Sequence, residues 1–452
     1  MRWLVLLVAS IFFYWFGGSA TLFVPAIIIL CTYSCGYGIE KTTTAFNKKM
    51  IYLLGLSINL GLLIFYKYIN FFIASFFDVA HAFHVQSFQN DPVFLHVIVP
   101  LGISYISFQA IGYLIEIHRG NQLAEKHLGY FATYLLFFPK LLSGPIERAH
   151  HFIPQLKIAH TFNEVQFVGG LKRILWGMFL KLVIANRIAL YTDAVFNNSA
   201  QHSGITLWVA ALLFTVQLFA DFSGYTDMAI GSAQLLGFQL IENFDKPFMA
   251  KSVTEFWRRW HISLTTWVNE YIYNPIVVSC RNWNKWAVVF AGMVTFLILG
   301  FWHGPSWNYI IFGFLQGFIL AIEFLTRKLR KKWRSHIPDT LNSILGIAYT
   351  FIYFSVSVIF FKVQTAGTAL NILKKMMTTT GSFFLDSTTL TYAAIGIFLL
   401  LLNGIKQAWF PTKWLMFDSR NSMVRYASYL VIVLLIVLIG VLDNSQFIYF
   451  QY

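Results

Sequence analysis

Residues 286–301 read WAVVFAGMVTFLILGF, residues 308–325 read NYIIFGFLQGFILAIEFL, and WHGPSW lies between them at 302–307. A helix needs roughly 20 mostly apolar residues to cross a hydrocarbon layer about 30 Å thick. Both runs approach this length, and the glycine and proline between them interrupt a helix. We therefore predict two membrane spans that meet at a short break, where His303 is partly buried and partly reached by water.

Similar apolar runs recur along the whole chain. The 452 residues are 57% hydrophobic and 12% charged, with a mean hydropathy of +0.62, whereas a soluble domain is about 25% charged. Some runs are short or are interrupted, by Pro139, Gly144 and Pro145 or by Gly169 and Gly170, so we expect an all-α polytopic membrane protein with about eleven crossings plus re-entrant helices. The candidate spans are 3–16, 21–38, 51–76, 93–117, 128–143, 168–190, 205–220, 225–240, 286–301, 308–325, 341–362, 389–403 and 426–442.

These runs leave no separate soluble domain, so we expect one transmembrane domain over 1–452 with a motif-rich core at about 100–325. Basic residues gather in the short segments 41–49 and 327–334, which the positive-inside rule places in the cytoplasm. Counting spans from there places the tail, 443–452, on the outer side. The same rule accounts for the net charge of +14, and nucleic-acid binding is not expected.

Several common chemistries lack their motifs. Cys31 and Cys35 have no further Cys or His partners at zinc-binding spacing, so we expect small core residues and no metal site. The chain has no Walker-type glycine loop, dinucleotide fingerprint or Gly-x-Ser-x-Gly elbow. ATP-driven pumping and serine hydrolysis are therefore disfavoured.

Residues 217–309 carry many ionisable side chains among apolar runs. Such groups cost several kcal/mol at membrane depth unless they are paired or hydrated, and they often mark a functional site. His303 suits a general base because an imidazole has an ordinary pKa of roughly 6.5; the alternative is a hydrogen-bonded core histidine. The tryptophans at 257, 260 and 267 around Arg258 and Arg259 also fit a helix at the membrane interface, and both alternatives stay open on the residues alone.

Several longer motifs occur in a fixed order along nearly the whole chain. They are FADFSGYTDMAI at 219–230, EFWRRWHISLTTW at 255–267 and FWHG at 301–304, with PLGISY at 100–105, FQ at 108–109, FPK at 138–140 and SGPI at 143–146. Together they resemble the membrane-bound O-acyltransferases, in the bacterial branch that includes alginate O-acetylases, peptidoglycan O-acetyltransferases and D-alanine transferases.

The resemblance implies a ring of tilted helices around a central tunnel that joins a cytoplasmic donor side to an outer acceptor side. It assigns His303 as the catalytic histidine and His261 as a second residue of the same chamber. No bound cofactor is implied, and acetyl-CoA or another acyl thioester is the expected donor. The residues expected to support the tunnel or the donor side are Asp221, Ser223, Tyr225, Asp227, Arg258, Arg259 and Trp302.

The chain ends in FIYFQY at 447–452, similar to an aromatic ending that carries an acyl-accepting tyrosine in this family. We expect Tyr449 to accept the acetyl group, although the final Tyr452 departs from the usual Phe; the alternatives are a tail packed at the membrane interface and a covalent acetyl-histidine. The implied location is the bacterial inner membrane, with a periplasmic C-terminus. A periplasmic SGNH-type O-acetyltransferase, or alginate-type acetylation partners, would complete the transfer.

The polymer is not fixed by the motifs. After Tyr273-Asn274-Pro275 the chain lacks the Gly-Gly-Asn loop of alginate relatives, which favours peptidoglycan over alginate or another exopolysaccharide. A secondary transporter or flippase is the alternative from another class. It predicts an inverted internal repeat, which the sequence does not display.

Overall fold

The computed structural model describes residues 2–84, 92–409, 417 and 419–442, without the side chains of 405–409. These residues form helices and one isolated β-bridge, which confirms the all-α fold. Within this part of the chain, ten helical segments are long and apolar enough to cross a membrane, which confirms a multi-pass membrane protein. They are Arg2–Thr21, Phe23–Lys41, Ala45–Ala82, Glu164–Asn197, Gly204–Leu235, Lys285–His303, Trp307–Leu325, Asp339–Lys362, Ser387–Gly404 and Ser422–Ile439.

The chain divides into two compact units. Unit 1 comprises Met1–Phe162, Phe238–Leu240 and Trp302–Ser306, and unit 2 comprises the remainder. The prediction of one domain and that of a central tunnel stay predictions. The helices of unit 1 are α1 (Arg2–Gly18), η1 (Ser19–Thr21), α2 (Phe23–Lys41), α3 (Ala45–Leu63), η2 (Ile64–Tyr68), α4 (Ile69–Ala82), α5 (Ile103–Arg119), α6 (Leu128–Leu136), η4 (Phe138–Lys140) and α7 (Ala149–Lys157).

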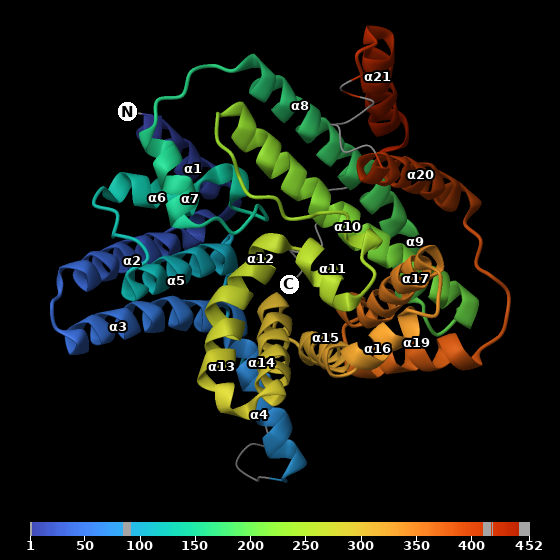
Figure 1. Cartoon of the computed structure of the whole chain (residues 1–452), viewed down its shortest axis with the longest axis horizontal. Coiled ribbons are helices and arrows are strands. Elements are labelled where there is room, and N and C mark those ends of the chain that lie inside the picture. Colours follow the sequence, from blue (N-terminus) through green and yellow to red (C-terminus); the bar gives the residue numbers. More distant parts are fainter. Residues whose placement is uncertain (1, 85–91, 410–416, 418, 443–452) are drawn as a thin grey trace. The chain divides into compact units, whose positions relative to one another are not determined.

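Helices α2, α3 and α5 lie side by side in unit 1 (Figure 1). A Cβ atom on Gly55 of α3 would lie 2.8 Å from Leu114 of α5 and 3.1 Å from Cys35 of α2, so the missing side chain lets the three helices meet. The run 128–143 is interrupted as predicted, because α6 ends at Leu136, three residues before Pro139. The expected span 93–117 is helical only from Ile103, where the 17-residue helix α5 begins, and this helix continues to Arg119.

Unit 2 contains the remaining helices, and α14 reaches from it into unit 1 with its last two residues. Its helices are α8 (Glu164–Phe179), η5 (Leu180–Ala185), α9 (Asn186–Asn197), α10 (Gly204–Leu235), η6 (Pro247–Met249), α11 (Val253–Arg259), α12 (Ile262–Val268), η7 (Asn269–Tyr273), α13 (Asn274–Ser279), η8 (Arg281–Trp283), α14 (Lys285–His303), α15 (Trp307–Leu325), α16 (Arg327–Arg334), α17 (Asp339–Ser357), α18 (Ile359–Lys362), α19 (Ala366–Thr378), α20 (Ser387–Trp409) and α21 (Ser422–Ile439).

Helices α8 and α10 form an antiparallel hairpin in unit 2 (Figure 1). A Cβ atom on Gly177 would lie 2.6 Å from the carbonyl oxygen of Gly224, and one on Gly170 would lie 2.8 Å from that of Gly231. Glycines seven residues apart on both helices therefore bring the two backbones together. The prediction that Gly169 and Gly170 break a span is wrong, because α8 continues through both.

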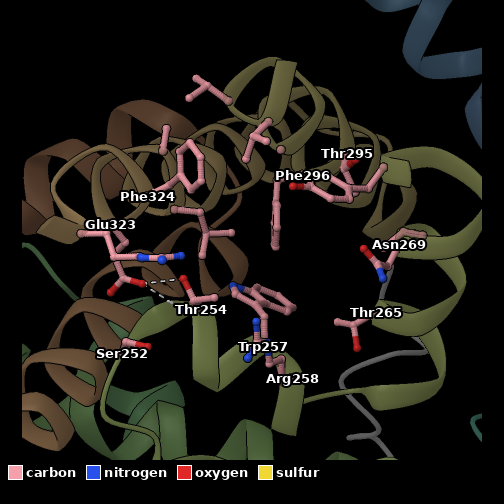
Figure 2. Close-up of a pocket in the computed structure, with 18 of the residues that line it drawn as sticks. Ser252, Thr254, Trp257, Arg258, Thr265, Asn269, Thr295, Phe296, Glu323 and Phe324 are labelled. Atoms are coloured by element: carbon pink, nitrogen blue, oxygen red, sulfur yellow. Dashed lines mark hydrogen bonds between the residues drawn. The ribbon is translucent and has the colours of Figure 1, made fainter. Parts of the chain in front are cut away.

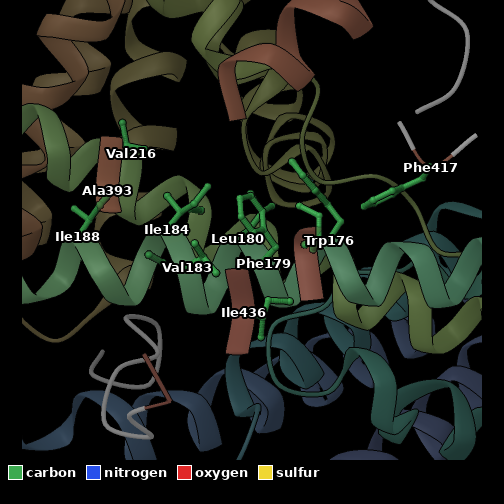
Figure 3. Close-up of a cluster of buried hydrophobic side chains, with 13 residues drawn as sticks. Trp176, Phe179, Leu180, Val183, Ile184, Ile188, Val216, Ala393, Phe417 and Ile436 are labelled. Carbon is green, nitrogen blue, oxygen red and sulfur yellow. The ribbon is translucent and has the colours of Figure 1, made fainter. Parts of the chain in front are cut away.

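Predicted spans 205–220 and 225–240 are a single helix, α10, of 32 residues. The polar residues in the middle of α10 do not interrupt the helix, because residues of α8 and η5 pair with them. Around η5, buried side chains from α8, α9, α10, α20 and α21 form one apolar cluster that includes Trp176, Leu180, Val216 and Ile436 (Figure 3). This cluster fixes the hairpin against the later spans.

Candidate functional site

The break at 302–306 has the predicted form, since α14 ends at His303 and α15 begins at Trp307. His303 is buried, with 6% of its surface exposed, so it is less exposed than the partial burial that was predicted. The Lys67 ammonium donates to the carbonyl oxygens of Trp302, at 2.8 Å, and of His303, at 3.2 Å, and the Tyr68 hydroxyl donates to that of Trp302 at 3.1 Å. The last carbonyls of a helix have no partner within the helix and favour a cation. Two consecutive residues of η2 therefore hold the helix end that carries His303.

The indole of Trp302 lies against the histidine ring. Their centroids are 5.0 Å apart, with the planes inclined by 68°. The same indole contacts Tyr105 and Phe108 of α5, with centroid distances of 5.9 and 5.5 Å. The motifs FWHG and PLGISY with FQ thus meet at one place in unit 1, as catalytic and supporting groups of one site would.

A buried lysine connects a third motif to this place. Lys140, 1% exposed, donates from its ammonium to the side-chain oxygen of Gln109, and the Gln109 amide donates to the Tyr105 carbonyl oxygen at 3.2 Å. The ammonium also faces the rings of Tyr134 and Phe152, at 4.4 and 4.8 Å from their centroids. An ammonium surrounded by aromatic faces and an amide is stabilised without an aqueous shell. The lysine of FPK thereby orients the α5 residues behind Trp302.

The second predicted histidine, His261, lies in unit 2 directly before α12. It is 1% exposed, and its ring meets the Phe222 ring of α10 edge to face at 4.6 Å. It lies outside the ten candidate spans, and burial lowers its pKa to about 3, so the imidazole is neutral near pH 7. Its backbone has a φ of +48°, a left-handed conformation uncommon outside glycine and often found at functional sites.

Asn243 fixes this strained residue, a contact that no sequence pattern indicated. Its carbonyl oxygen accepts from the Ile262 amide at 2.9 Å, and its side-chain oxygen accepts from the Ser263 amide at 3.2 Å. The Asp245 amide also donates to the Arg259 carbonyl oxygen at 3.0 Å. Segments 243–245 and 259–263 therefore hold His261 between them. A single asparagine in a loop is too common for its spacing to predict this contact.

The predicted tunnel residues on α10 lie where this helix contacts α8 and η5. Asp221 forms an ion pair with Lys181, whose ammonium lies 5.4 Å from the Tyr225 ring centroid. Asp227 accepts from the Arg173 guanidinium at 2.9 Å, and the same guanidinium binds Glu242 at 2.5 and 2.6 Å. The pairs at Asp221 and Asp227 offset the cost of burying these two carboxylates. Ser223 and Asp227 also line a cavity of about 310 Å³.

The adjacent arginines of EFWRRWH have different surroundings. Arg259 pairs with Glu255 at 2.8 Å, whereas Arg258 lines a larger pocket of about 910 Å³ (Figure 2). The tryptophans at 257, 260 and 267 are only 6%, 3% and 4% exposed. The alternative of a helix with its indoles at the lipid interface is therefore wrong, since these indoles pack inside the protein.

One of the residues singled out in the sequence has no described position. Tyr449 lies outside the described residues. Trp302 is buried beside His303 as described above. Lys67 was missed, although an ammonium within the apolar segment Ala45–Ala82 is the kind of signal that marks a functional group.

The described residues define a helical membrane protein with a buried histidine fixed at the end of a span. The family model of the membrane-bound O-acyltransferases matches residues 123–363, and the chain belongs to this family. It is therefore an acyltransferase, and the motif-based prediction of the family is confirmed.

Three relatives with different names are similar in sequence to this chain. The chain is 34% identical to the "Probable alginate O-acetylase AlgI" of Pseudomonas putida over 81% of this chain and 73% of that protein. It is 32% identical to the peptidoglycan O-acetyltransferase of Helicobacter pylori over 83% of this chain and 73% of that protein. It is 31% identical to the teichoic acid D-alanyltransferase of Bacillus subtilis over 56% of this chain and 65% of that protein.

Proposed function

We propose that this protein is an O-acetyltransferase that moves acetyl groups from a cytoplasmic thioester, such as acetyl-CoA, to a polysaccharide outside the inner membrane. The observation that carries the proposal is the fixed position of His303 at the end of α14, held through backbone carbonyls by Lys67 and enclosed by Trp302. The similarity to an alginate O-acetylase and a peptidoglycan O-acetyltransferase supports acetyl as the group transferred.

His303 acts as the general base in this proposal. Its neutral imidazole takes the proton of the acceptor hydroxyl while the hydroxyl oxygen attacks the thioester carbonyl. The C–S bond breaks, the new C–O bond forms, and the thiolate leaves with the proton that the imidazole held. Anchoring through the backbone carbonyl suits this role, because it fixes the end of the helix that carries the imidazole.

The phenol of Tyr449 is the proposed acceptor. With an ordinary pKa of roughly 10, a phenol needs a base to attack, and its ester remains reactive enough for a second transfer. A periplasmic SGNH-type O-acetyltransferase or an alginate-type acetylation partner would then pass the acetyl group to the polymer. Transfer through an acetyl-histidine is the alternative route.

Peptidoglycan is the proposed polymer, on the missing Gly-Gly-Asn loop after residue 275, and alginate or another exopolysaccharide is the alternative. The identities of 34% to the alginate enzyme and 32% to the peptidoglycan enzyme do not separate them. Acetate content of purified cell wall and of secreted polysaccharide from a deletion strain distinguishes the two. Loss from the wall alone supports peptidoglycan, and loss from the secreted polymer alone contradicts it.

Release of free CoA from acetyl-CoA by purified protein tests the enzyme. His303→Ala should reduce the rate at least about 100-fold, as loss of a general base does. His336→Ala is the matched control, because His336 is exposed on the loop after α16 and should keep the full rate. A transporter or flippase would release no CoA, and a His303→Ala variant with an unchanged rate would exclude general-base catalysis by this residue.

Intact-mass analysis after incubation with labelled acetyl-CoA tests the relay. Wild-type protein should gain one acetyl group, and Tyr449→Phe should not. Tyr452→Phe is the control for a neighbouring phenol. Undiminished transfer from Tyr449→Phe to the partner and the polymer would refute the relay while leaving the acetyltransferase activity intact.

A further inference from the structure

The larger pocket of unit 2 has a charged side and an apolar side. Its wall on the spans α14 and α15 includes Val288, Phe296, Leu320 and Phe324, and α11 and α12 contribute polar and aromatic groups (Figure 2). Its cations are Arg258, Arg327, Arg330, Lys331 and Arg334, and Glu323 is the one carboxylate among the described residues that line it. The pocket therefore suits an amphiphile whose head is an anion.

The single carboxylate is already engaged. Glu323 accepts from the Val253 amide at 3.1 Å. It also accepts from the Thr254 amide at 3.0 Å and from the Thr254 hydroxyl at 2.6 Å (Figure 2). Arg330 approaches the same carboxylate at 3.7 Å. Glu323 thus binds the first turn of α11 and holds Arg330 in place, so it opposes an incoming anion little.

The other cations of the pocket are available to a ligand. Among the described residues, no carboxylate lies within ion-pair distance of Arg258, Arg327 or Lys331, and Arg334 makes only a 3.5 Å contact with the Lys251 carbonyl oxygen. Arginines present several donors in a planar arrangement that matches phosphate oxygens. Because the protein places few carboxylates beside these cations, the pocket favours a ligand that carries phosphate.

Helix α16 separates its side chains into two faces. Arg327, Arg330, Lys331 and Arg334 fall on the face that lines the pocket, following the 3.6-residue repeat. Leu329 and Trp333 lie on the opposite face and are 63% and 72% exposed. An exposed indole and leucine on a basic helix are typical of the headgroup layer of a membrane. The basic segment 327–334, from which the orientation of the chain in the membrane was predicted, also forms one wall of a pocket.

We infer that this pocket binds a phosphorylated amphiphile, with its phosphate at the arginines of α11 and α16 and its apolar part along α14 and α15. Two sources share this chemistry: an anionic phospholipid of the cytoplasmic leaflet, or the phosphorylated head of the thioester donor. The second source rests on the proposed function, whereas the binding site itself does not.

The test compares two double variants of one helix. Arg327→Gln/Arg334→Gln removes two cations from the pocket face and leaves Arg330 with Glu323. Lys328→Gln/Lys332→Gln removes two cations of α16 that do not line the pocket. One arm measures the Kd of CoA for protein in neutral detergent, with pantetheine as the phosphate-free control. The other measures the phosphatidylglycerol retained from mixed phosphatidylcholine nanodiscs by native mass spectrometry.

The arginine variant should bind the phosphorylated ligand about 10- to 100-fold more weakly, and the lysine variant should stay within about twofold of wild type. A loss confined to CoA identifies the donor as the source, and a loss confined to phosphatidylglycerol identifies the bilayer. Unchanged binding in both arms, or equal losses in the two variants, would overturn the inference. Because both arms measure binding and not turnover, a protein without acetyltransferase activity would still give a result.

Discussion

Replacing Lys67 with methionine tests whether the anchored end of α14 matters for the chemistry. The substitution keeps a long apolar side chain and removes the ammonium that donates to Trp302 at 2.8 Å and to His303 at 3.2 Å. The Trp302 carbonyl retains its bond from Tyr68 at 3.1 Å. The loss therefore falls mainly on the carbonyl of the residue that we assign as the base.

One hydrogen bond from a charged donor contributes about 1.5–3 kcal/mol. If the whole of this stabilisation is needed to hold the imidazole in its reactive position, kcat for CoA release should fall about 10- to 150-fold. KM for the donor should change little, because Lys67 holds the base. Lys67→Arg should recover part of the rate, since a guanidinium still donates to a carbonyl.

Lys362→Met is the matched control for loss of a partly buried ammonium. Lys362 lies in α18 and pairs with Asp193 of α9. Both residues belong to unit 2, whereas His303 and Lys67 belong to unit 1, and neither residue of the pair lies in a motif that surrounds His303. Its substitution should lower the thermal midpoint and leave kcat of the folded protein unchanged. A Lys67→Met protein that folds and turns over within about twofold of wild type would refute the positioning role, since the bond lost is expected to be worth at least about tenfold.

Three further predictions concern stability. The folded-state pKa of His261, about 3, lies below its unfolded value near 6.5, so the contribution of His261 to stability is full above about pH 6.5 and is lost as the pH falls towards 3. The free energy of unfolding should therefore be about 2 kcal/mol lower at pH 5 than at pH 7. His261→Asn should flatten this pH dependence. Gly170→Ala should destabilise the protein by about 1–3 kcal/mol through its clash with α10, whereas Gly169→Ala, whose Cβ meets nothing within 4 Å, should not lower the thermal midpoint. Lys181→Met should cost about 3–5 kcal/mol in unfolding free energy by leaving Asp221 without its cation, and Lys181→Met/Asp221→Leu should recover most of it, a recovery whose absence would contradict the pairing.

Apolar length and composition were enough to predict the fold class. A segment in a bilayer must satisfy its own backbone hydrogen bonds, so a long apolar run has little choice but to be helical. The break at His303 was equally readable, because Gly304 and Pro305 act on the backbone next to them. The order of the motifs was enough to predict the family.

Local sequence was misleading where a partner lies far along the chain. The sequence predicted two spans, 205–220 and 225–240, with Asp221 between them. Lys181, 40 residues earlier, pairs with the Asp221 carboxylate, and the two predicted spans form one continuous helix. Gly170 predicted a break because glycine weakens an isolated helix, but in the hairpin it allows α10 to approach. Whether a glycine ends a helix or packs it depends on what lies opposite.

The sequence by itself determined the helical membrane architecture, the family and the two histidines worth testing, since these follow from backbone satisfaction and from motifs that are contiguous. Only the tertiary structure decided that Lys67 holds the end of α14, that Asn243 fixes His261, and that Arg259 pairs with Glu255 whereas Arg258 lines a pocket. The physical reason is the separation along the chain between the groups that interact. Hydrogen bonding within a helix is set over four residues, whereas the contacts that orient a side chain join segments separated by many tens or hundreds of residues and exist only when the chain is packed.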